Sequence, residues 1–339
     1  MQVQKNIPLK NYSTMRLGGP ATALATVHSK DELLAALDWA MAQHLPVLML
    51  GEGSNIIVQD TGFAGLVIID RIDGFAVLQD TTDFATIRVG AGEHWDTVVA
   101  RTVKMGVSGI EPLSLIPGTA GATPVQNVGA YGAEIADTLV ELEAYDLQTK
   151  RFITLSKTDC QFSYRNSRFK SLENRRYIIT NITLKLGKHK PQPPFYQSLQ
   201  RYFDEHHIVD YTPLAIRQAV ITLRTRTLPD PKIIANTGSF FKNPIVPRPK
   251  LEELQINHPD MPFYDMPDGR VKLLAGWLID QAGLKGYHAH GLKVYEHNAL
   301  VFVNESAHSY SDLALFKEEV VQKVHHTFGV TLQQEPELI

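Results

Sequence analysis

The chain of 339 residues has a single cysteine, Cys160, no long apolar run and no excess of either charge. A lone cysteine excludes a disulfide framework and any zinc or iron–sulfur site built from several cysteines. No segment is long enough to span a bilayer, and the N-terminus lacks a signal-peptide core. The net charge of −3 disfavours a nucleic-acid surface. We therefore expect a soluble protein of a reducing compartment, with no nucleic-acid or membrane partner.

The usual nucleotide and metal motifs are absent as well. Gly90-Ala91-Gly92 follows an expected strand and precedes a helix, but Trp95 occupies the third glycine position of a dinucleotide fingerprint. No Walker-type phosphate loop occurs. The 13 histidines include no H-E-x-x-H, and none has cysteine or carboxylate neighbours at ligand spacing. We interpret the glycine pair as a tight turn and the histidines as surface or structural residues, so no metal is expected.

The length predicts two or three domains with ordinary cores. Helices are expected after the capping-box pair Ser29 and Glu32, from about His94 to Gly106, from Thr212-Pro213 to about Thr225, and up to Gly329. Strands are expected at 46–50, 66–70, 84–89 and 177–186, the last with Ile178, Thr180, Ile182 and Leu184 on one face. Breaks fall at 187–195 and 228–232. Because strands outnumber helices in the middle third, the predicted class is α+β.

Residues 116–132, the glycine-rich loop, contain four glycines and two prolines and cannot form a regular helix or strand. Glycines let a ligand approach the main chain closely. The remaining amides, with Thr119, Gln126 and Asn127, suit a large ligand that carries phosphates or a heterocycle. A long surface loop is the alternative for any single glycine. Four glycines in seventeen residues favour a cofactor site.

Four further segments carry polar groups. Gly51-Glu52-Gly53-Ser54-Asn55 follows a strand and could bind a pyrophosphate, although alone it could be a turn. Ser239, in G-S-F-F-K-N-P, is not in a nucleophile elbow and could donate a proton or simply cap a turn. Arg165, in Y-R-N-S, could grip a carboxylate, although most arginines are solvated. Glu335 and Glu337 lie in what could be an ordinary polar tail.

Together these motifs resemble the UDP-N-acetylenolpyruvoylglucosamine reductase (UDP-N-acetylmuramate dehydrogenase) family. The similarity runs through N-Y-S-T-M-R-L-G-G-P-A at 11–21, G-E-G-S-N at 51–55, the glycine-rich loop, Y-R-N-S at 164–167, L-P-D-P-K at 228–232, G-S-F-F-K-N-P at 238–244 and A-G-W-L-I-D-Q at 275–281. The resemblance implies a two-part, vanillyl-alcohol-oxidase-type (PCMH-like) FAD-binding region and a C-terminal α+β domain for the UDP-sugar. The implied boundaries are 1–62, 63–227 and 228–339, with the substrate-capping tyrosine loop of the longer class near 188–212.

The resemblance also implies residue roles. The catalytic residues would be Arg165, Ser239 and Glu335. Non-covalent FAD would contact Gly51, Gly53, Ser54, Asn55, Pro117, Gly118, Thr119, Gly121, Ala122, Gln126, Asn127, Gly129, Tyr131 and Gly132. The substrate would contact Tyr131, Tyr196, Lys242, Asn243, Tyr264, Lys285 and Asn298.

The implied reaction is the NADPH-dependent reduction of UDP-N-acetylglucosamine enolpyruvate in the bacterial cytoplasm, by a monomer, for peptidoglycan synthesis. The chain departs from the family pattern at Thr227, where a lysine is common, and at Asn298, which matches a glutamine. The catalytic carboxylate could be Glu335 or Glu337. Two other functions stay open: an FAD-dependent oxidase or dehydrogenase of the same fold with another substrate, and a non-catalytic flavin-binding sensor.

Overall fold

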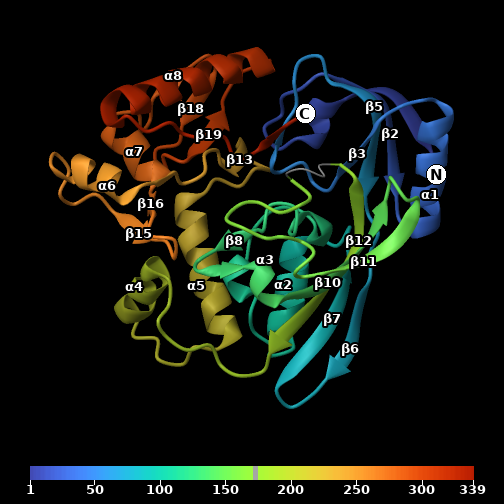
Figure 1. Ribbon diagram of the computed structural model, residues 1–339, viewed down its shortest axis with the longest axis horizontal. Helices are drawn as coiled ribbons and strands as arrows, with labels where there is room; N and C mark the ends of the chain where they lie inside the picture. The colour runs from blue at the N-terminus through green and yellow to red at the C-terminus, as the bar shows by residue number, and fades with distance from the viewer. Residues whose placement is uncertain (171–174) are drawn as a thin grey trace. The chain divides into compact units, whose positions relative to one another are not determined.

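The computed structural model describes residues 1–170 and 175–339 (Figure 1). Contacts within the chain divide it into two compact units. The first unit comprises Met1–Ile7, Ala21–Glu52 and Ala64–Arg226. The second comprises Pro8–Pro20, Gly53–Phe63 and Thr227–Ile339. Two N-terminal segments therefore belong with the C-terminal part of the chain, and the division into three domains stays a prediction.

A four-stranded sheet and one helix begin the first unit. The strands have the order β1-β2-β5-β3, with bounds Val3–Pro8, Pro20–Val27, Phe63–Asp70 and Val47–Leu50. Helix α1 (Lys30–Ala42) begins where expected, because the Ser29 hydroxyl accepts the Glu32 N–H at 3.2 Å. Its apolar side chains pack against β2 and β5 in one core.

A five-stranded antiparallel sheet forms the larger part of the first unit. Its order is β11-β10-β12-β7-β6, with bounds Arg151–Ser156, Leu139–Asp146, Tyr177–Gly187, Phe84–Gly90 and Phe75–Asp80. Helix α2 (Trp95–Lys104) packs against this sheet and buries Trp95, Val98, Val99 and Val103. In Figure 1, α2 lies beside β10, β12 and β7.

The expected single apolar face of β12 is wrong. The register against β10 shifts between Asn181 and Ile179, so Thr180 is the extra residue of a β-bulge. Ile178 therefore lies in the core shared with α1, whereas Ile182 lies in the core shared with α2. A bulge reverses the side-chain alternation on either side of it, and period-two counting cannot reveal it.

Short elements complete the first unit. They are the 3₁₀ turns η2 (Glu111–Leu113) and η3 (Ala120–Ala122), the hairpin of β8 (Gly129–Ala130) and β9 (Ala133–Glu134), and helices α3 (Ile135–Thr138), α4 (Gln197–Glu205) and α5 (Pro213–Thr227). Helix α4 lies within the segment expected as a tyrosine loop. It packs on α5 through Leu199, Phe203, Ile216, Ala219 and Val220.

The second unit has its own aromatic and aliphatic core. One sheet has the order β13-β19-β18-β17, with bounds Ala235–Ser239, Val301–Asn304, Leu292–Val294 and His288–Ala289. Another has the order β14-β16-β15, with bounds Ile245–Val246, Val271–Leu273 and Phe263–Asp265. The helical elements are η1 (Leu9–Tyr12), α6 (Arg248–Gln255), α7 (Ala275–Gln281) and α8 (Tyr310–Phe328). Gly329, at φ 62°, ends α8 as expected.

A short parallel ladder joins two segments of the second unit that are far apart in the sequence. Strand β20 (Glu337–Leu338) pairs with β4 (Ile56–Ile57). The segment after the Gly51–Asn55 motif is thereby tied to the segment that carries Glu335. In the described parts of the chain, no helix is both long and apolar enough to cross a membrane.

Candidate cofactor and catalytic site

The first half of the glycine-rich loop lies along the connection between β7 and α2. Three backbone hydrogen bonds of 2.8–3.0 Å join them, from Trp95 to Gly118, from Ala120 to Glu93 and from Gly121 to Ala91. A Cβ added to Gly121 would lie 2.5 Å from the Ala91 Cβ, so the packing requires glycine. The Gly90–Gly92 turn is thus a structural partner of the loop.

Glu52 also holds the start of the loop. Its Oε2 accepts the Gly118 N–H at 2.9 Å, and its Oε1 lies 3.5 Å from His94 Nε2. A Cβ on the neighbouring Gly51 would lie 2.5 Å from Thr119 Oγ1. Glu52 was not predicted as a site residue, although it lies inside the G-E-G-S-N motif.

Asn127 holds the second half of the loop. This side chain is only 1% exposed and its backbone is left-handed at φ 48°. Its Nδ2 donates to Glu134 Oε2 at 2.6 Å and to the Ser163 carbonyl at 3.2 Å, while its Oδ1 accepts the Ala136 N–H. Asn127 thereby ties the loop to β9 and to the Y-R-N-S turn. Its side-chain amide is used internally and supports the conformation of the loop.

Arg165 lies at the tip of a two-residue turn. Ser163 and Asn166 exchange backbone hydrogen bonds of 3.0 and 3.1 Å, and Arg165 between them is left-handed at φ 52°. Its Nη2 donates to the Gly129 carbonyl at 2.6 Å. A guanidinium carries five N–H donors in a plane, which suits it to a carboxylate. The structure therefore places Arg165 at the glycine-rich loop.

Two predicted substrate contacts lie together in the first unit. Tyr131 and Tyr196 meet edge to face, with ring centroids 6.1 Å apart. Tyr196 directly precedes α4, which packs on α5. Burial raises the pKa of the Tyr131 phenol above its usual value, so it stays a neutral hydroxyl at physiological pH.

In the second unit, Ser239 and Glu335 are on adjacent segments. The Glu335 N–H donates to the carbonyl of Phe240, the residue after Ser239, at 2.9 Å. Two residues later, the Glu337 N–H donates to the Asn55 carbonyl at 2.9 Å. Glu335 is 9% exposed, whereas Glu337 is partly exposed. One short segment therefore links the Ser239 strand to the end of the G-E-G-S-N motif.

Gly53 explains why that motif requires its second glycine. The residue has φ 64°, and an added Cβ would lie 1.8 Å from the Tyr12 carbonyl oxygen. The Thr14 N–H donates to the Gly53 carbonyl at 3.2 Å. Ser54 and Asn55 follow this fixed position. Gly51 is described with the first unit, and Gly53 with the second.

Three predicted substrate contacts share hydrogen-bonded segments with Ser239. The Lys242 N–H donates to the Gln333 carbonyl at 2.9 Å, and Asn243 Oδ1 accepts the Ala275 N–H at 2.9 Å. Asn298 Oδ1 accepts the Leu300 N–H at 3.1 Å, and the Leu300 carbonyl accepts the Phe240 N–H. Lys242 and Asn298 are thus hydrogen-bonded to segments that also contact Phe240 or lie beside Glu335, and Asn243 is hydrogen-bonded to the start of α7.

The other two predicted contacts of the second unit lie on β15 and after α7. Tyr264 is on β15, where the Lys272 ammonium lies 5.3 Å from its ring centroid. Lys285 follows α7, has an exposed side chain, and pairs with Asp280 at 3.2 Å. Among residues 1–170 and 175–339, no group of three or more histidine, cysteine or acidic side chains could hold a metal ion.

Family models match both parts of the chain. The model described as "UDP-N-acetylenolpyruvoylglucosamine reductase, C-terminal domain" matches residues 230–339, and the model described as "FAD binding domain" matches residues 21–155. The UDP-N-acetylenolpyruvoylglucosamine reductase of Ralstonia nicotianae is 42% identical over 335 residues, covering 98% of each chain. The Neisseria gonorrhoeae reductase is 40% identical over 97% of this chain and 95% of its own.

A solved structure gives the same result. The UDP-N-acetylenolpyruvylglucosamine reductase of Thermus caldophilus matches with a TM-score of 0.69 at 26% identity, covering 100% of this chain and 99% of that one. These comparisons confirm the predicted fold class and FAD as the cofactor.

The residues of the loop fit such a cofactor. Gly118 and Gly132 are left-handed at φ 121° and 84°, and a Cβ on Gly132 would meet only Tyr196 within 4 Å. Pro117, Gln126 and Gly129 are partly exposed, whereas Ala120 and Asn127 are buried, so one edge of the loop can face a ligand.

Proposed function

The chain belongs to the UDP-N-acetylenolpyruvoylglucosamine reductase family, and we propose that it reduces UDP-N-acetylglucosamine enolpyruvate to UDP-N-acetylmuramate with NADPH. The observation that carries this proposal is the 42% identity to a reductase of that name over 98% of both chains. The chain is accordingly an FAD-containing oxidoreductase of peptidoglycan precursor synthesis. As part of the proposal, it acts as a monomer in the bacterial cytoplasm.

When bound, FAD would supply the chemistry of hydride transfer between NADPH and the methylene carbon of the enolpyruvyl group. The residues proposed to hold it are Gly51, Gly53, Ser54, Asn55, Pro117, Gly118, Thr119, Gly121, Ala122, Gln126, Asn127, Gly129, Tyr131 and Gly132. Their main chain is fixed by the hydrogen bonds and close packing described above. A fixed main chain provides preorganised hydrogen-bonding groups.

Arg165, Ser239 and Glu335 are the proposed catalytic residues. Arg165 holds the substrate carboxylate, toward which negative charge moves during the reduction. Ser239 then donates a proton to the carbon beside that carboxylate. The enolate-like intermediate is a strong base, so a neutral hydroxyl is a sufficient acid. Burial and the hydrogen bond to the Ser239 strand favour Glu335 over Glu337 as the catalytic carboxylate.

The substrate contacts form two groups in this proposal. Tyr131 and Tyr196 are the aromatic pair of the first unit, and Tyr196 acts as the tyrosine of the substrate-capping loop. The second unit supplies Lys242, Asn243, Tyr264, Lys285 and Asn298 toward the UDP-sugar. Lysine and asparagine side chains donate hydrogen bonds, as a diphosphate requires.

An anaerobic experiment tests the proposal. The purified protein is reduced with NADPH, and UDP-N-acetylglucosamine enolpyruvate is then added while the flavin absorbance is followed. Reoxidation of the flavin by the sugar is the expected result. If the sugar does not reoxidise the flavin but oxygen admitted afterwards does so rapidly, the protein would instead be an oxidase of the same fold. A flavin that neither NADPH nor the sugar affects would indicate a sensor.

The Ser239→Ala variant tests the assignment of the proton donor. Flavin reduction by NADPH should be unchanged, while reoxidation by the sugar should slow by about 10²-fold or more. Ser306→Ala, the same change at an exposed serine of the same unit, is the control. Equal losses in both half-reactions of Ser239→Ala would contradict the assignment.

A further inference from the structure

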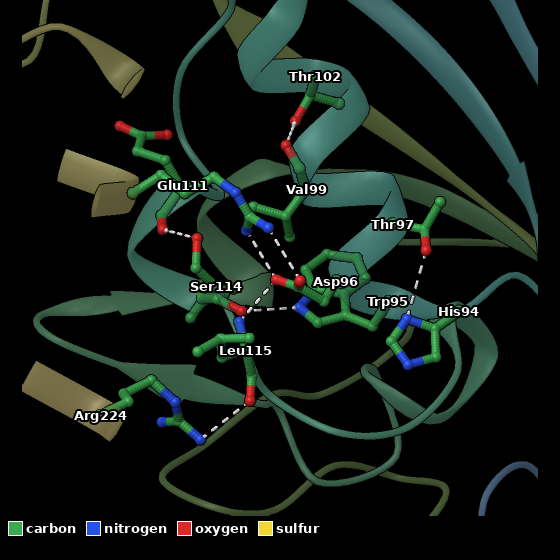
Figure 2. Close-up of polar contacts among 12 residues, drawn as sticks. His94, Trp95, Asp96, Thr97, Val99, Thr102, Glu111, Ser114, Leu115 and Arg224 are labelled. Carbon is green, nitrogen blue, oxygen red and sulfur yellow. Dashed lines mark hydrogen bonds and ion pairs between the residues drawn. The ribbon is translucent and has the colours of Figure 1, made fainter. Parts of the chain in front are cut away.

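The first turn of α2 holds the segment that leads into the glycine-rich loop (Figure 2). The Trp95 indole N–H donates to the Leu113 carbonyl at 3.1 Å, and the Trp95 backbone N–H donates to the Gly118 carbonyl at 3.0 Å. Between these two points, the Leu115 N–H donates to Asp96 Oδ1 at 2.6 Å. The segment is therefore fixed at three positions within six residues.

Arg217 of α5 holds the Asp96 carboxylate in place. Its Nη1 donates to Oδ1 at 2.7 Å and its Nη2 to Oδ2 at 2.8 Å, a two-point contact. The two side chains are only 13% and 18% exposed, so water screens the pair weakly. Arg224, two turns further along α5, donates to the Leu115 carbonyl at 3.3 Å.

Leu115 needs this support because its backbone is left-handed, at φ 56°. That conformation is unfavourable for a bulky residue without a surrounding structure that fixes it. Its side chain is 37% exposed, so packing contributes little to holding it. Both of its backbone polar groups are bound by charged side chains, the N–H by Asp96 and the carbonyl by Arg224.

We propose that Asp96, held by Arg217, is a positioning residue for the cofactor, because it keeps Leu115 left-handed and so sets where Gly118 and Thr119 lie. The inference rests on the proposed function, since it takes the glycine-rich loop to be the FAD site. Neither residue contacts the cofactor in this scheme. They determine the conformation of the main chain that does.

In this proposal, Arg217 is needed to keep the negatively charged Asp96 carboxylate beside the Leu115 N–H. Without the guanidinium, a largely buried carboxylate would lack its partner and would turn toward water. The Leu115 N–H would then lose its acceptor, and Leu115 would relax to an extended conformation. The following residues would move with it, so the loop would no longer present the same groups to FAD.

A matched pair of variants tests this proposal. Arg217→Met breaks the Asp96 pair, and Arg176→Met breaks a second two-point pair in the same unit, in which Arg176 donates to Asp146 at 2.9 and 2.8 Å. Both variants should lower the denaturation midpoint. The dissociation constant of FAD, measured by quenching of flavin fluorescence, should rise at least tenfold in Arg217→Met and less than twofold in Arg176→Met. Equal FAD affinities in the two variants would overturn the proposal.

FAD binding by the wild-type protein distinguishes failure of the positioning role from failure of the proposed function. If it binds FAD and Arg217→Met binds FAD equally well, the positioning role fails while the proposed function stands. If the wild-type protein binds no FAD, the proposed function fails and the inference fails with it. Should Arg217→Met not fold, Arg217→Lys retains the charge but only a point contact, and an intermediate loss of affinity is expected.

A rescue experiment addresses Leu115 directly. Asp96→Ala should weaken FAD binding at least tenfold, because the Leu115 N–H loses its acceptor. Glycine adopts the left-handed conformation without strain. Adding Leu115→Gly to Asp96→Ala should therefore recover most of the lost affinity, and hydrogen exchange at the Gly118 amide should slow again. A double variant as weak as Asp96→Ala alone would overturn the proposal.

Discussion

The two halves of the glycine-rich loop are held by different interactions. Residues 116–121 are held mainly by backbone hydrogen bonds and by the close approach of Gly121 to Ala91. Residues 127–132 are held by side chains, chiefly Asn127 and Arg165. Of its own residues, the first half therefore depends chiefly on the absence of side-chain atoms at Gly121. The second depends on hydrogen-bonding groups and on charge, and it is the half that carries a proposed catalytic residue.

This contrast makes opposite predictions for substitutions. Among substitutions of the loop's own residues, changes in side-chain size should damage the first half most, and changes in polarity should damage the second half most. In the proposed site, the first half would offer a rigid main chain to the cofactor. The second half would place the charged side chain of Arg165 near the substrate. The variants below test that contrast, beginning with the largest expected effect.

Arg165→Met should have the largest effect, because it removes both a proposed catalytic charge and the bond to the Gly129 carbonyl. Reoxidation of reduced flavin by the sugar should slow by about 10³-fold, the size expected for loss of a preorganised charge at a developing anion. Stopped-flow absorbance would measure each half-reaction separately. Arg165→Lys, which retains the charge without the planar fork, should lose less. An unchanged sugar half-reaction in Arg165→Met would remove Arg165 from the mechanism.

The Asp70 carboxyl, which is linked by hydrogen bonds to the turn beside the first half of the loop, should make the stability of the protein depend on pH. Burial raises the pKa of Asp70 from 3.8 to about 7, and its Oδ1 accepts the Ile72 N–H at 2.9 Å. The Ile72 carbonyl in turn accepts the Gly92 N–H at 2.7 Å. In the unfolded chain this carboxyl ionises at lower pH than in the folded protein. The contribution of the protonated Asp70 carboxyl to the free energy of unfolding is therefore complete below pH 4 and is lost as the pH rises through 7.

Asp70→Asn remains neutral and should not show that loss. Relative to wild type, its free energy of unfolding should increase by about 4 kcal/mol between pH 4 and pH 8. Urea denaturation at several pH values would measure the difference. Asp146→Asn is the informative contrast: Arg176 lowers the pKa of Asp146, so the stabilisation by this carboxylate is lost only below about pH 4, and the difference between Asp146→Asn and wild type should stay nearly constant from pH 4 to pH 8. A constant difference between Asp70→Asn and wild type across this range would contradict the prediction.

Gly121→Ala tests the size dependence of the first half. The added Cβ would lie 2.5 Å from the Ala91 Cβ and 3.1 Å from its Cα, so the main chain must move. The free energy of unfolding should fall by roughly 2–3 kcal/mol, as measured by urea denaturation. Gly187→Ala, where the nearest atom would be 3.8 Å away, is the matched control and should change it little. Adding Ala91→Gly to Gly121→Ala should recover part of the loss.

The sequence predicted most of the long elements because their signals are local. Ser29 caps α1 and Gly329 ends α8 as expected. The bulge at Thr180 was not foreseeable, because it is defined by the register against a strand more than 30 residues away. Helix α4 was missed because it lies within a segment expected as a loop, where it is stabilised by packing on α5.

The residues of the candidate site likewise include some that the sequence could predict and some that only the structure reveals. The glycine-rich loop and the Ser239 motif could be found because unusual residues cluster within a short stretch. The Asp96–Arg217 pair could not, because its members are 121 residues apart and each is an ordinary polar residue on a helix. Glu52 could have been predicted from the sequence, because it lies inside a motif whose two glycines are predicted FAD contacts. Local patterns predict which groups face a ligand, whereas the residues that support those groups appear only with the fold.

Asn127→Ala tests the polarity dependence of the second half. The variant removes two donated hydrogen bonds, leaves the Ala136 N–H without its acceptor, and places alanine at φ 48°. The free energy of unfolding should fall by about 2 kcal/mol. Glu134→Gln retains a neutral acceptor for the same Nδ2 and should cost less than about 1 kcal/mol. If Asn127→Ala cost no more than Gly187→Ala, the second half would be held by its main chain, as the first is, and the contrast between the two halves would be wrong.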